Sequence, residues 1–139
     1  MHNVAATLRF RTRGSGLMEI TAEVRSWLES QQVTTGLLTL FCRHTSASLL
    51  IQENAARAVR SDLERFFAAL APEDSRRYEH NDEGADDMPA HLRSALTAVQ
   101  LSIPVSEGRL TLGTWQGIYL FEHRHRAHER EIALHLIGE

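Results

Sequence analysis

The sequence predicts a single α+β domain with a mixed, largely antiparallel β-sheet and about three helices. Its 139 residues are the size of one ordinary domain, and we expect that domain to span residues 1–139. Apolar residues make up 42% of the chain and charged residues 24%, which is typical of a globular protein. Helical and strand patterns do not alternate in regular β-α-β units, which favours an α+β arrangement over a doubly wound parallel sheet.

The first quarter of the chain predicts a strand followed by a helix. Residues 4–11 alternate in part between apolar and basic side chains, and residues 13–16 form a glycine-rich turn. Residues 18–32 have helical spacing, with Thr21 as the expected N-cap. The apolar residues that share one face of this helix are Ile20, Val24, Trp27 and Leu28.

The stretch over residues 36–54 combines β-prone and chemically versatile residues. An apolar run at residues 37–42 predicts a buried strand, which ends in a polar cluster that includes His44, Thr45 and Ser46. The chain turns apolar again at residues 49–51. We therefore expect a rigid strand that presents His44 at its rim, since rigid elements position functional groups well.

Two further helices and a long acidic loop follow. Residues 55–70 keep helical spacing, with Asn54 as the expected cap. Residues 72–89 show no periodicity, and a loop of that length inside a domain is usually functional or disordered. A short helix over residues 89–100 is expected next, capped by Asp87.

The last third of the chain is predicted to be β. Residues 102–105 form a short strand, and residues 107–108 a tight turn. Residues 109–121 form one long strand or two strands broken at Gly113. A polar loop or hairpin end over residues 122–129 leads to a final strand at residues 131–138.

Charge and cysteine content exclude several classes of protein. The formal net charge is −3 with the eight histidines neutral, which gives no general attraction to nucleic acid or to an anionic membrane. No run of about 18 apolar residues is present, so no membrane span is expected. The single cysteine, Cys42, lies in an apolar run and is expected to be a buried hydrophobe. We expect a cytoplasmic protein with neither nucleic-acid nor membrane partners.

Three histidines lie on different predicted elements: His44 at a strand rim, His80 in the long loop and His91 at a helix start. Three neutral imidazoles with an open fourth position form a common catalytic zinc shell. Carboxylates usually orient such ligands, and the candidates are Glu53, Asp82, Asp87 and Glu122. No pair of these histidines forms a local motif, so an ordinary surface or hydrogen-bonded histidine is the alternative at each position.

Other polar residues have two readings each. Thr45, Ser46 and Ser48 are phosphate donors or turn residues; no GxSxG or P-loop motif is present, so a serine nucleophile is not favoured. Trp115 and Gln116 form the wall of a small-molecule pocket, or Trp115 belongs to the core or an interface. The sequence EHRHRAHER is interpreted as a solvated hairpin end, with a metal site at His123, His125 and His128 as the alternative.

Short segments spread over nearly the whole chain form an ordered pattern. They are Ile20-Thr21, Gly36, His44-Thr45-Ser46-Ala47, Glu53-Asn54, Asp62-Leu63, Tyr78-Glu79-His80, Pro89-Ala90-His91, Ile103-Pro104-Val105, Gly108-Arg109-Leu110 and Leu112-Gly113-Thr114-Trp115-Gln116. On this pattern, and above all on its last segment and the His-Thr block, the chain resembles the YjbQ-like family, also called the secondary thiamine-phosphate synthase family.

The resemblance implies a small α+β protein that assembles as a homotrimer, with histidines in a cleft near a subunit interface where metal or anions bind. It implies metal ligands at His44, His80 and His91. It places the family's Trp-Gln pair on Trp115 and Gln116, and its carboxylates on Glu53 and Glu122. The family label implies a weak activity that joins a pyrimidine diphosphate to a thiazole phosphate and releases diphosphate.

The chain departs from the family pattern at two places. Many members have Asn-Ala-Asp-Ala-His where this chain has residues 87–91, so that an aspartate of the motif is Pro89 here. Many members also have Gly-Pro-Arg after the glutamate that corresponds to Glu122. This chain has His-Arg-His-Arg instead, which leaves Arg124 and Arg130 as the candidates for phosphate binding beside Thr45 and Ser46.

Three functional hypotheses follow. The first is a metal-assisted enzyme for a small phosphorylated metabolite, including the thiamine-phosphate synthase reaction, in which a metal and an arginine stabilise the departing diphosphate. The second is a non-catalytic trimeric protein that binds a small anion or a metal. The third is a metal-dependent hydrolase. A histidine shell favours zinc, although diphosphate chemistry usually uses magnesium, which therefore remains the alternative metal.

Overall fold

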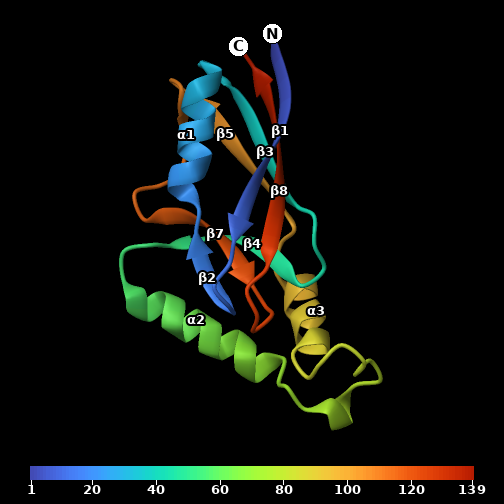
Figure 1. Ribbon diagram of the computed structural model, residues 1–139. Coiled ribbons are helices and arrows are strands. Elements are labelled where there is room, and N and C mark those ends of the chain that lie inside the picture. The colour runs from blue at the N-terminus through green and yellow to red at the C-terminus, as the bar shows by residue number, and fades with distance from the viewer.

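The two ends of the chain pair with each other along one side of the molecule (Figure 1). The computed structural model describes residues 1–139. Strand β1 (His2–Arg11) lies antiparallel to β8 (Glu129–Gly138) over their full length, from His2 opposite Gly138 to Arg11 opposite Glu129. The predicted first and last strands are both confirmed, each two residues longer at its start than the pattern indicated.

Five strands form the larger sheet, in the order β1-β8-β3-β5-β6. The central strand β3 (Gly36–Cys42) pairs with β8 on one side and with β5 (Gln100–Ser106) on the other. A turn with positive φ at Glu107 and Gly108 joins β5 to β6 (Arg109–Leu110), as the sequence predicted. Every pairing in this sheet is antiparallel.

A second sheet has the order β2-β7-β4, also antiparallel. Its strands are β2 (Gly16–Glu19), β7 (Gln116–Glu122) and β4 (Ala47–Glu53). The expected break near Gly113 is confirmed, because residues 111–115 separate β6 from β7. Three α-helices and two antiparallel sheets confirm the predicted α+β class.

Helix α1 (Thr21–Gln31) begins later than predicted because residues 16–19 form strand β2 instead of its first turn. Thr21 is not its N-cap: the hydroxyl donates to Glu19 (2.8 Å) and accepts the N–H of Ile118 (2.8 Å), which joins the helix start to β7. The core lies between α1, the inner face of the large sheet and the small sheet. It includes Val24 and Leu28 of α1, both buried.

Helix α2 (Arg57–Leu70) crosses the lower end of the molecule in Figure 1 and buries none of its residues completely. Asn54 does not cap it, since its amide donates to Glu19 (3.1 Å). At the far end, Arg93 of α3 donates to the carbonyl oxygens of Phe67 (3.2 Å) and Ala71 (2.7 Å). A buried arginine on the last carbonyls of a helix is favourable for the helix dipole.

Helix α3 (Asp87–Leu96) is reached through residues 71–86, which include a short 3-10 helix (Ser75–Arg77). The prediction of Asp87 as a cap was wrong, because Asp87 is the first helical residue and its side chain is used elsewhere. Helix α3 is fastened to β4 by the hydroxyl of Ser94, which donates to the carbonyl oxygen of Ala47 (3.1 Å). No helix of this chain combines the length and apolar character that crossing a bilayer requires.

Candidate functional site

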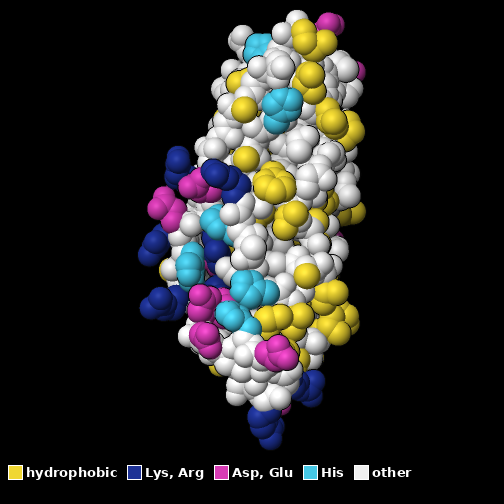
Figure 2. Space-filling model, turned by 90° about the vertical axis from the view of Figure 1, so that its right-hand side faces the viewer, with side chains coloured by type: hydrophobic (Ala, Val, Ile, Leu, Met, Phe, Trp, Pro, Cys, Tyr) yellow, Lys and Arg dark blue, Asp and Glu magenta, His cyan; other side chains and the backbone are white.

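Four potential metal ligands meet where the long loop joins α3. They are His80, Glu83, Asp87 and His91, and one ligand atom of each lies within 4.8 Å of all the others. Figure 2 shows histidine, acidic and basic side chains gathered on the lower half of one face of the molecule. Two of the three histidines singled out from the sequence, His80 and His91, are therefore neighbours.

Local structure places these side chains. Asp87 and His91 are separated by four residues in α3 and so lie on one face of the helix. His80 is brought against them by the loop. Oδ2 of Asp87 lies 2.8 Å from Nε2 of His80 and 3.0 Å from Nε2 of His91. Asp87 is buried, whereas the side chains of the two histidines are 41% and 30% exposed, so the cluster is open to solvent on its histidine side.

The tautomer of His91 follows from its second hydrogen bond. Nδ1 of His91 lies 2.8 Å from the carbonyl oxygen of Thr45. A carbonyl oxygen only accepts hydrogen bonds, so Nδ1 carries a hydrogen and Nε2 is the nitrogen that faces Asp87. When Nε2 carries no proton, its lone pair points at the carboxylate. Two acceptors 3.0 Å apart need a proton or a cation between them. Metal-binding histidines typically donate their other N–H to a carbonyl or carboxylate in this way.

The charges of the cluster shift its protonation equilibria. The hydrogen bond to Asp87 raises the pKa of His80, against the opposing effect of desolvation. Desolvation alone would raise the pKa of Asp87, but the hydrogen bond from His80 and the charges of His91 and Arg124 hold it below its usual range. Asp87 is therefore an ionised carboxylate at neutral pH and suits a cation.

The donor set fits a transition metal. Two imidazole nitrogens and a carboxylate oxygen are a common zinc ligand set with one position left for water or substrate. Glu83 is 64% exposed at its side chain and lies near His80, so it is available as a further ligand. Magnesium prefers oxygen ligands alone and fits this set less well.

His44 lies next to this cluster but outside it within one chain. Its Nε2 accepts the N–H of Glu131 (2.8 Å). Burial and the nearby charge of Arg130 lower its pKa, so the ring is neutral. The two histidine sites are joined through the backbone, because the residue after His44 is Thr45, whose carbonyl oxygen accepts from His91.

A pocket of about 560 Å³ opens around His44. It contains three of the four residues that the sequence suggested for phosphate binding, namely Thr45, Ser46 and Arg130. Nη2 of Arg130 donates to the carbonyl oxygen (3.2 Å) and to the hydroxyl (3.0 Å) of Ser46. Arg43 also lines the pocket, so that two guanidinium groups and two hydroxyls surround it.

Glu122 and Arg130 form a closed ion pair beside this pocket. Their side chains are 1% and 5% exposed, and Oε1 of Glu122 accepts from Nε of Arg130 (2.9 Å) and from the hydroxyl of Thr12 (2.7 Å). Oε2 accepts from Nη2 of Arg130 and from the N–H groups of His123 (3.1 Å) and Arg124 (3.2 Å). All these donors hold Glu122 in the interior, where its Oε1 lies 3.9 Å from Nδ1 of the partly exposed His128.

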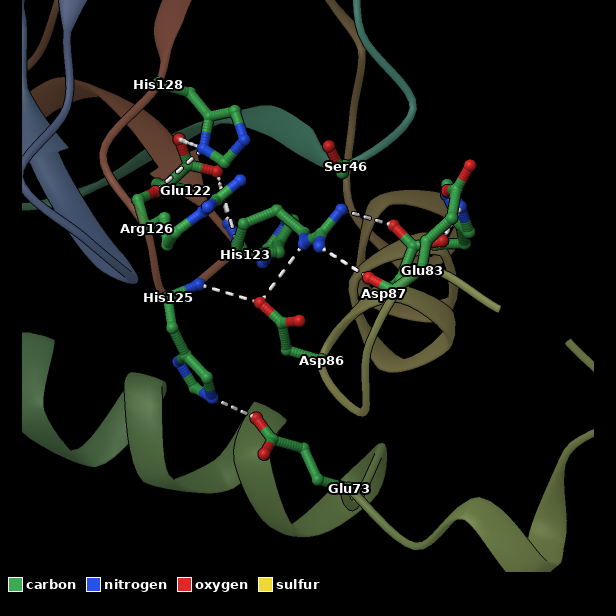
Figure 3. A network of polar contacts seen from close by, with 12 residues as sticks. Ser46, Glu73, Glu83, Asp86, Asp87, Glu122, His123, His125, Arg126 and His128 are labelled. Atoms are coloured by element: carbon green, nitrogen blue, oxygen red, sulfur yellow. Dashed lines mark hydrogen bonds and ion pairs between the residues drawn. The ribbon is translucent and has the colours of Figure 1, made fainter. Parts of the chain in front are cut away.

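Arg124 reaches across to the acidic loop. Its guanidinium group donates to Asp86 (3.1 Å), to Asp87 (2.7 Å) and to the carbonyl oxygen of Glu83 (2.9 Å). Figure 3 shows Asp86 and Asp87 with the dashed lines that end on them, one of which joins Asp86 to His125. The structure thus places this arginine on the cluster's own carboxylate rather than in the pocket around His44.

Glu53, Trp115 and Gln116 lie at the other end of β4. Six residue steps along that strand separate Ala47 from Glu53, a length of about 20 Å. The carboxylate of Glu53 accepts from the N–H of Ala56 (3.1 Å), and the amide oxygen of Gln116 accepts from the N–H of Gly113 (2.8 Å). Trp115 is 62% exposed. Within one chain these three residues are not brought together with the histidines.

The prediction that His123 belongs to a solvated hairpin end was wrong. His123 is completely buried, its Nε2 lies 2.9 Å from the hydroxyl of Ser48 and its ring packs on Phe121 with centroids 4.3 Å apart. Burial lowers its pKa to about 3. His125 is exposed as expected, and its Nε2 contacts the carboxylate of Glu73 (Figure 3).

Glu83 and Asp86 were not predicted from the sequence, and Asp87 was predicted as a helix cap and as a candidate carboxylate that orients the histidines. A local signal for Asp87 was present, since Asp87 lies four residues before His91, although the predicted helix began only at residue 89 with Asp87 as its cap. No comparable signal marked Asp86, whose partners Arg124 and His125 are more than thirty-five residues away along the chain. The buried state of Cys42 was anticipated, and burial raises the pKa of its thiol to about 11.

The chain is similar to known proteins over nearly its whole length. Residues 6–139 match the family described as UPF0047 protein, YjbQ-like. A UPF0047 protein of Synechocystis sp. is 55% identical over 92% of this chain and 87% of its own length. The UPF0047 protein YjbQ of Salmonella typhimurium is 49% identical over 96% of this chain and 95% of its own length.

Solved structures agree. A protein from Sulfolobus solfataricus, described as YbjQ-like and of unknown function, superposes with a TM-score of 0.87 at 26% identity and covers 99% of this chain and 100% of its own. A conserved hypothetical protein from Thermus thermophilus superposes with a TM-score of 0.84 at 36% identity, over 95% of this chain and 99% of its own. The chain therefore belongs to the YjbQ-like UPF0047 family, whose function is unknown.

Proposed function

We propose that this chain is a metal-dependent enzyme that binds a divalent transition metal, zinc in the first place, at His80, Asp87 and His91 and acts on a small phosphorylated metabolite. The observation that carries the proposal is the orientation of His91, whose Nδ1 lies 2.8 Å from the carbonyl oxygen of Thr45 while Nε2 faces Oδ2 of Asp87. Magnesium is the alternative metal and would depend chiefly on the carboxylates of Asp87 and Glu83.

In this proposal two adjoining sites have separate functions, one binding the metal and the other binding the phosphate. Asp87 and the two histidines bind the metal, and Thr45 orients His91. The pocket around His44 binds the phosphate through the hydroxyls of Thr45 and Ser46 and through Nη1 of Arg130, the terminal nitrogen that neither Glu122 nor Ser46 engages. Bound metal would act as a Lewis acid that stabilises negative charge on the reacting phosphate.

The reaction implied by the family resemblance fits this division. Joining a pyrimidine diphosphate to a thiazole phosphate requires stabilisation of the departing diphosphate, which a metal next to an anion pocket supplies. His44 is neutral because its pKa is lowered, and its Nε2 accepts the N–H of Glu131, so it contacts a phosphate as a neutral donor through Nδ1–H. It would join the metal as a further ligand only if Nε2 gave up that hydrogen bond. Glu53, Trp115 and Gln116 would join such a site only from another subunit.

A homotrimer would bring such a subunit close. The outer face of the large sheet carries Leu37, Phe41 and Ile137, which are 40%, 46% and 40% exposed. Leu37 and Ile137 are direct cross-strand neighbours, and Phe41 also lines the pocket around His44. Burial of these side chains against another copy would be favourable and would place the partner beside the pocket. Light scattering of the Phe41→Glu variant tests this, since a trimeric wild type and a monomeric variant are expected.

Metal binding is tested by titration with Zn²⁺ and by elemental analysis of the dialysed protein. We expect about one metal per chain in the wild type, loss of the metal in His91→Ala and retention in His135→Ala, a matched control whose histidine bonds only Asn3. Retention of about one metal per chain in His91→Ala would refute the assignment of His91 as a metal ligand. The same measurement on His44→Ala decides whether that histidine is a ligand or belongs to the phosphate pocket alone.

Turnover is tested separately with metal-loaded protein. Release of diphosphate from the pyrimidine diphosphate and thiazole phosphate pair would support the synthase reaction, and its loss in Arg130→Lys would implicate the arginine fork. Release of inorganic phosphate from other phosphorylated metabolites would favour the hydrolase. Metal binding without turnover on either set would assign the chain to the binding proteins.

A further inference from the structure

Every nitrogen of the Arg124 side chain donates a hydrogen bond to the segment that contains the potential metal ligands Glu83 and Asp87. Nε donates to Oδ2 of Asp86 (3.1 Å), Nη1 to Oδ1 of Asp87 (2.7 Å) and Nη2 to the carbonyl oxygen of Glu83 (2.9 Å). Its side chain is only 20% exposed. The three coplanar N–H donors of Arg124 bond to acceptors on three different residues, and together these bonds fix the orientation of the guanidinium group.

The two carboxylate oxygens of Asp87 therefore have different partners. Oδ1 accepts from Arg124, while Oδ2 faces Nε2 of His80 and Nε2 of His91. A carboxylate held at one oxygen cannot rotate freely, and it offers only the other oxygen to a cation. Asp87 is also 2% exposed, so water does not compete for Oδ1.

The same guanidinium group holds the backbone of Glu83. Its carbonyl oxygen is fixed by Nη2 of Arg124, and its side chain lies in the cluster with His80. Asp86, the third partner, also accepts the N–H of His125 (2.9 Å), so the loop is bound to the β7–β8 connection at two consecutive residues.

We propose that Arg124 is a positioning residue of the metal site: it fixes Asp87 as a one-oxygen ligand and keeps Glu83 over the cluster. The inference rests on the proposed function, because it concerns the same metal. It assigns to Arg124 a role different from phosphate binding. It also explains why the guanidinium cation lies beside a site proposed for a metal cation.

Positioning and electrostatics predict opposite results when Arg124 is removed. The positive charge of Arg124 repels a divalent metal, so its loss alone would tighten binding. Loss of the three guanidinium hydrogen bonds would allow Asp87 to rotate and the loop to move, and both changes weaken metal binding. Residues that orient a metal ligand typically contribute a factor of about 10–100 to metal affinity. The sign of the change therefore separates the two effects.

The experiment measures the affinity for Zn²⁺ by competition with a chromogenic chelator and records the visible spectrum of the Co²⁺-loaded protein. The variants are Arg124→Met, which is close in length and uncharged, and Arg124→Lys, which keeps the charge without the fork. Arg126→Met is the matched control, because Arg126 is an exposed arginine two residues away with no side-chain hydrogen bond.

We expect Zn²⁺ affinity to fall about 10–100-fold in Arg124→Met and at least several-fold in Arg124→Lys, with no change in Arg126→Met. The Co²⁺ spectrum of Arg124→Met at saturation should differ from that of the wild type, since Asp87 is then free to bind through both oxygens. A role confined to folding would change the unfolding transition but leave the spectrum at saturation unchanged.

Two results overturn the inference while the proposed function stands: unchanged or tighter Zn²⁺ binding in Arg124→Met, or an unchanged Co²⁺ spectrum. Absence of Zn²⁺ and Co²⁺ binding in the wild type overturns both. If Arg124→Met does not fold, the Co²⁺ spectrum of Asp86→Asn at saturation provides the test, because Asp86 anchors Nε of Arg124 and is not among the cluster ligands. The affinity alone does not, since loss of a negative charge also weakens cation binding. A changed spectrum in that variant supports positioning, and the wild-type spectrum refutes it.

Discussion

Two groups of charged residues lie on either side of the β7–β8 connection, and they differ in how fully their polar atoms are used. In the Glu122–Arg130 pair, both carboxylate oxygens accept from several donors and both side chains are almost inaccessible. In the cluster around Asp87, the carboxylate is equally buried, but the two histidines that face it are partly exposed.

The difference separates a structural ion pair from a ligand set. The carboxylate of Glu122 is fully engaged and has no capacity for a cation, although Nη1 of Arg130 has no partner. Removal of one member of such a buried pair leaves an uncompensated charge. In the Asp87 cluster, the lone pair of His91 Nε2 faces a carboxylate oxygen, which favours a proton or a metal between them. Exposure on the histidine side gives that cation a route in.

The largest expected effect comes from breaking the closed pair. Arg130→Met should lower the free energy of unfolding by about 3–5 kcal/mol, because Glu122 then keeps a buried charge without its partner. Urea denaturation monitored by circular dichroism measures the change. The double variant Glu122→Gln/Arg130→Met should lose markedly less than the two single variants combined. Additive losses would show that the two residues do not act as a pair.

Metal binding should affect only the open cluster. Zn²⁺ at a free concentration of about 100 times its Kd should stabilise the wild type by about 2.7 kcal/mol, because the ligand binds the folded state. Asp87→Asn should abolish that stabilisation, as seen by a thermal shift with and without Zn²⁺. The same shift in the variant and the wild type would place the binding site elsewhere on the chain.

The buried His123 should make the region next to the closed pair sensitive to acid. Its pKa is about 3 in the folded protein, owing to burial and the charges of Arg93 and Arg130, and its ordinary value is about 6.5. Between these values the unfolded chain binds the additional proton, so stability is lost as the pH falls below about 6.5. A shift from about pH 7 to about pH 5 should cost about 2 kcal/mol at this residue alone.

Denaturation of the wild type and of His123→Gln at both pH values isolates this contribution. The variant should lose less stability on acidification, because glutamine does not titrate. Equal losses in both proteins would mean that His123 is protonated or exposed in the folded state. Other acid-sensitive groups, such as Asp87, contribute equally to both proteins and cancel.

The smallest expected effect concerns an exposed ion pair near both groups. Arg43 and Glu131 are joined at 3.0 Å, but their side chains are 57% and 35% exposed. Arg43→Ala should change the free energy of unfolding by about 0.5 kcal/mol or less, since solvent screens such pairs. Chemical denaturation checks this value. A loss comparable to that of Arg130→Met would mean that burial is not what distinguishes the closed pair.

Local sequence patterns predicted most of the fold. The alternation in β1 and β8, the apolar run of β3 and the helical stripe of α1 each follow from nearby residues. Strand β2 was missed because the helix was predicted to begin at Met18, two residues before the first residue of its apolar stripe, and only pairing with β7 makes residues 16–19 a strand. Pairing between distant strands is not encoded in the spacing of either one alone.

The candidate site was predicted in part for the same reason. His80 and His91 were selected as metal ligands from the sequence, and the four-residue spacing of Asp87 and His91 was visible there. Glu122 and Arg130 were equally good candidates by residue type, although the structure commits them to each other. The residue types and helical spacings of this chain determined which groups are available for chemistry. Only the tertiary structure decided which are already satisfied, because a hydrogen bond such as that between Arg124 and Asp87 joins residues far apart in the sequence.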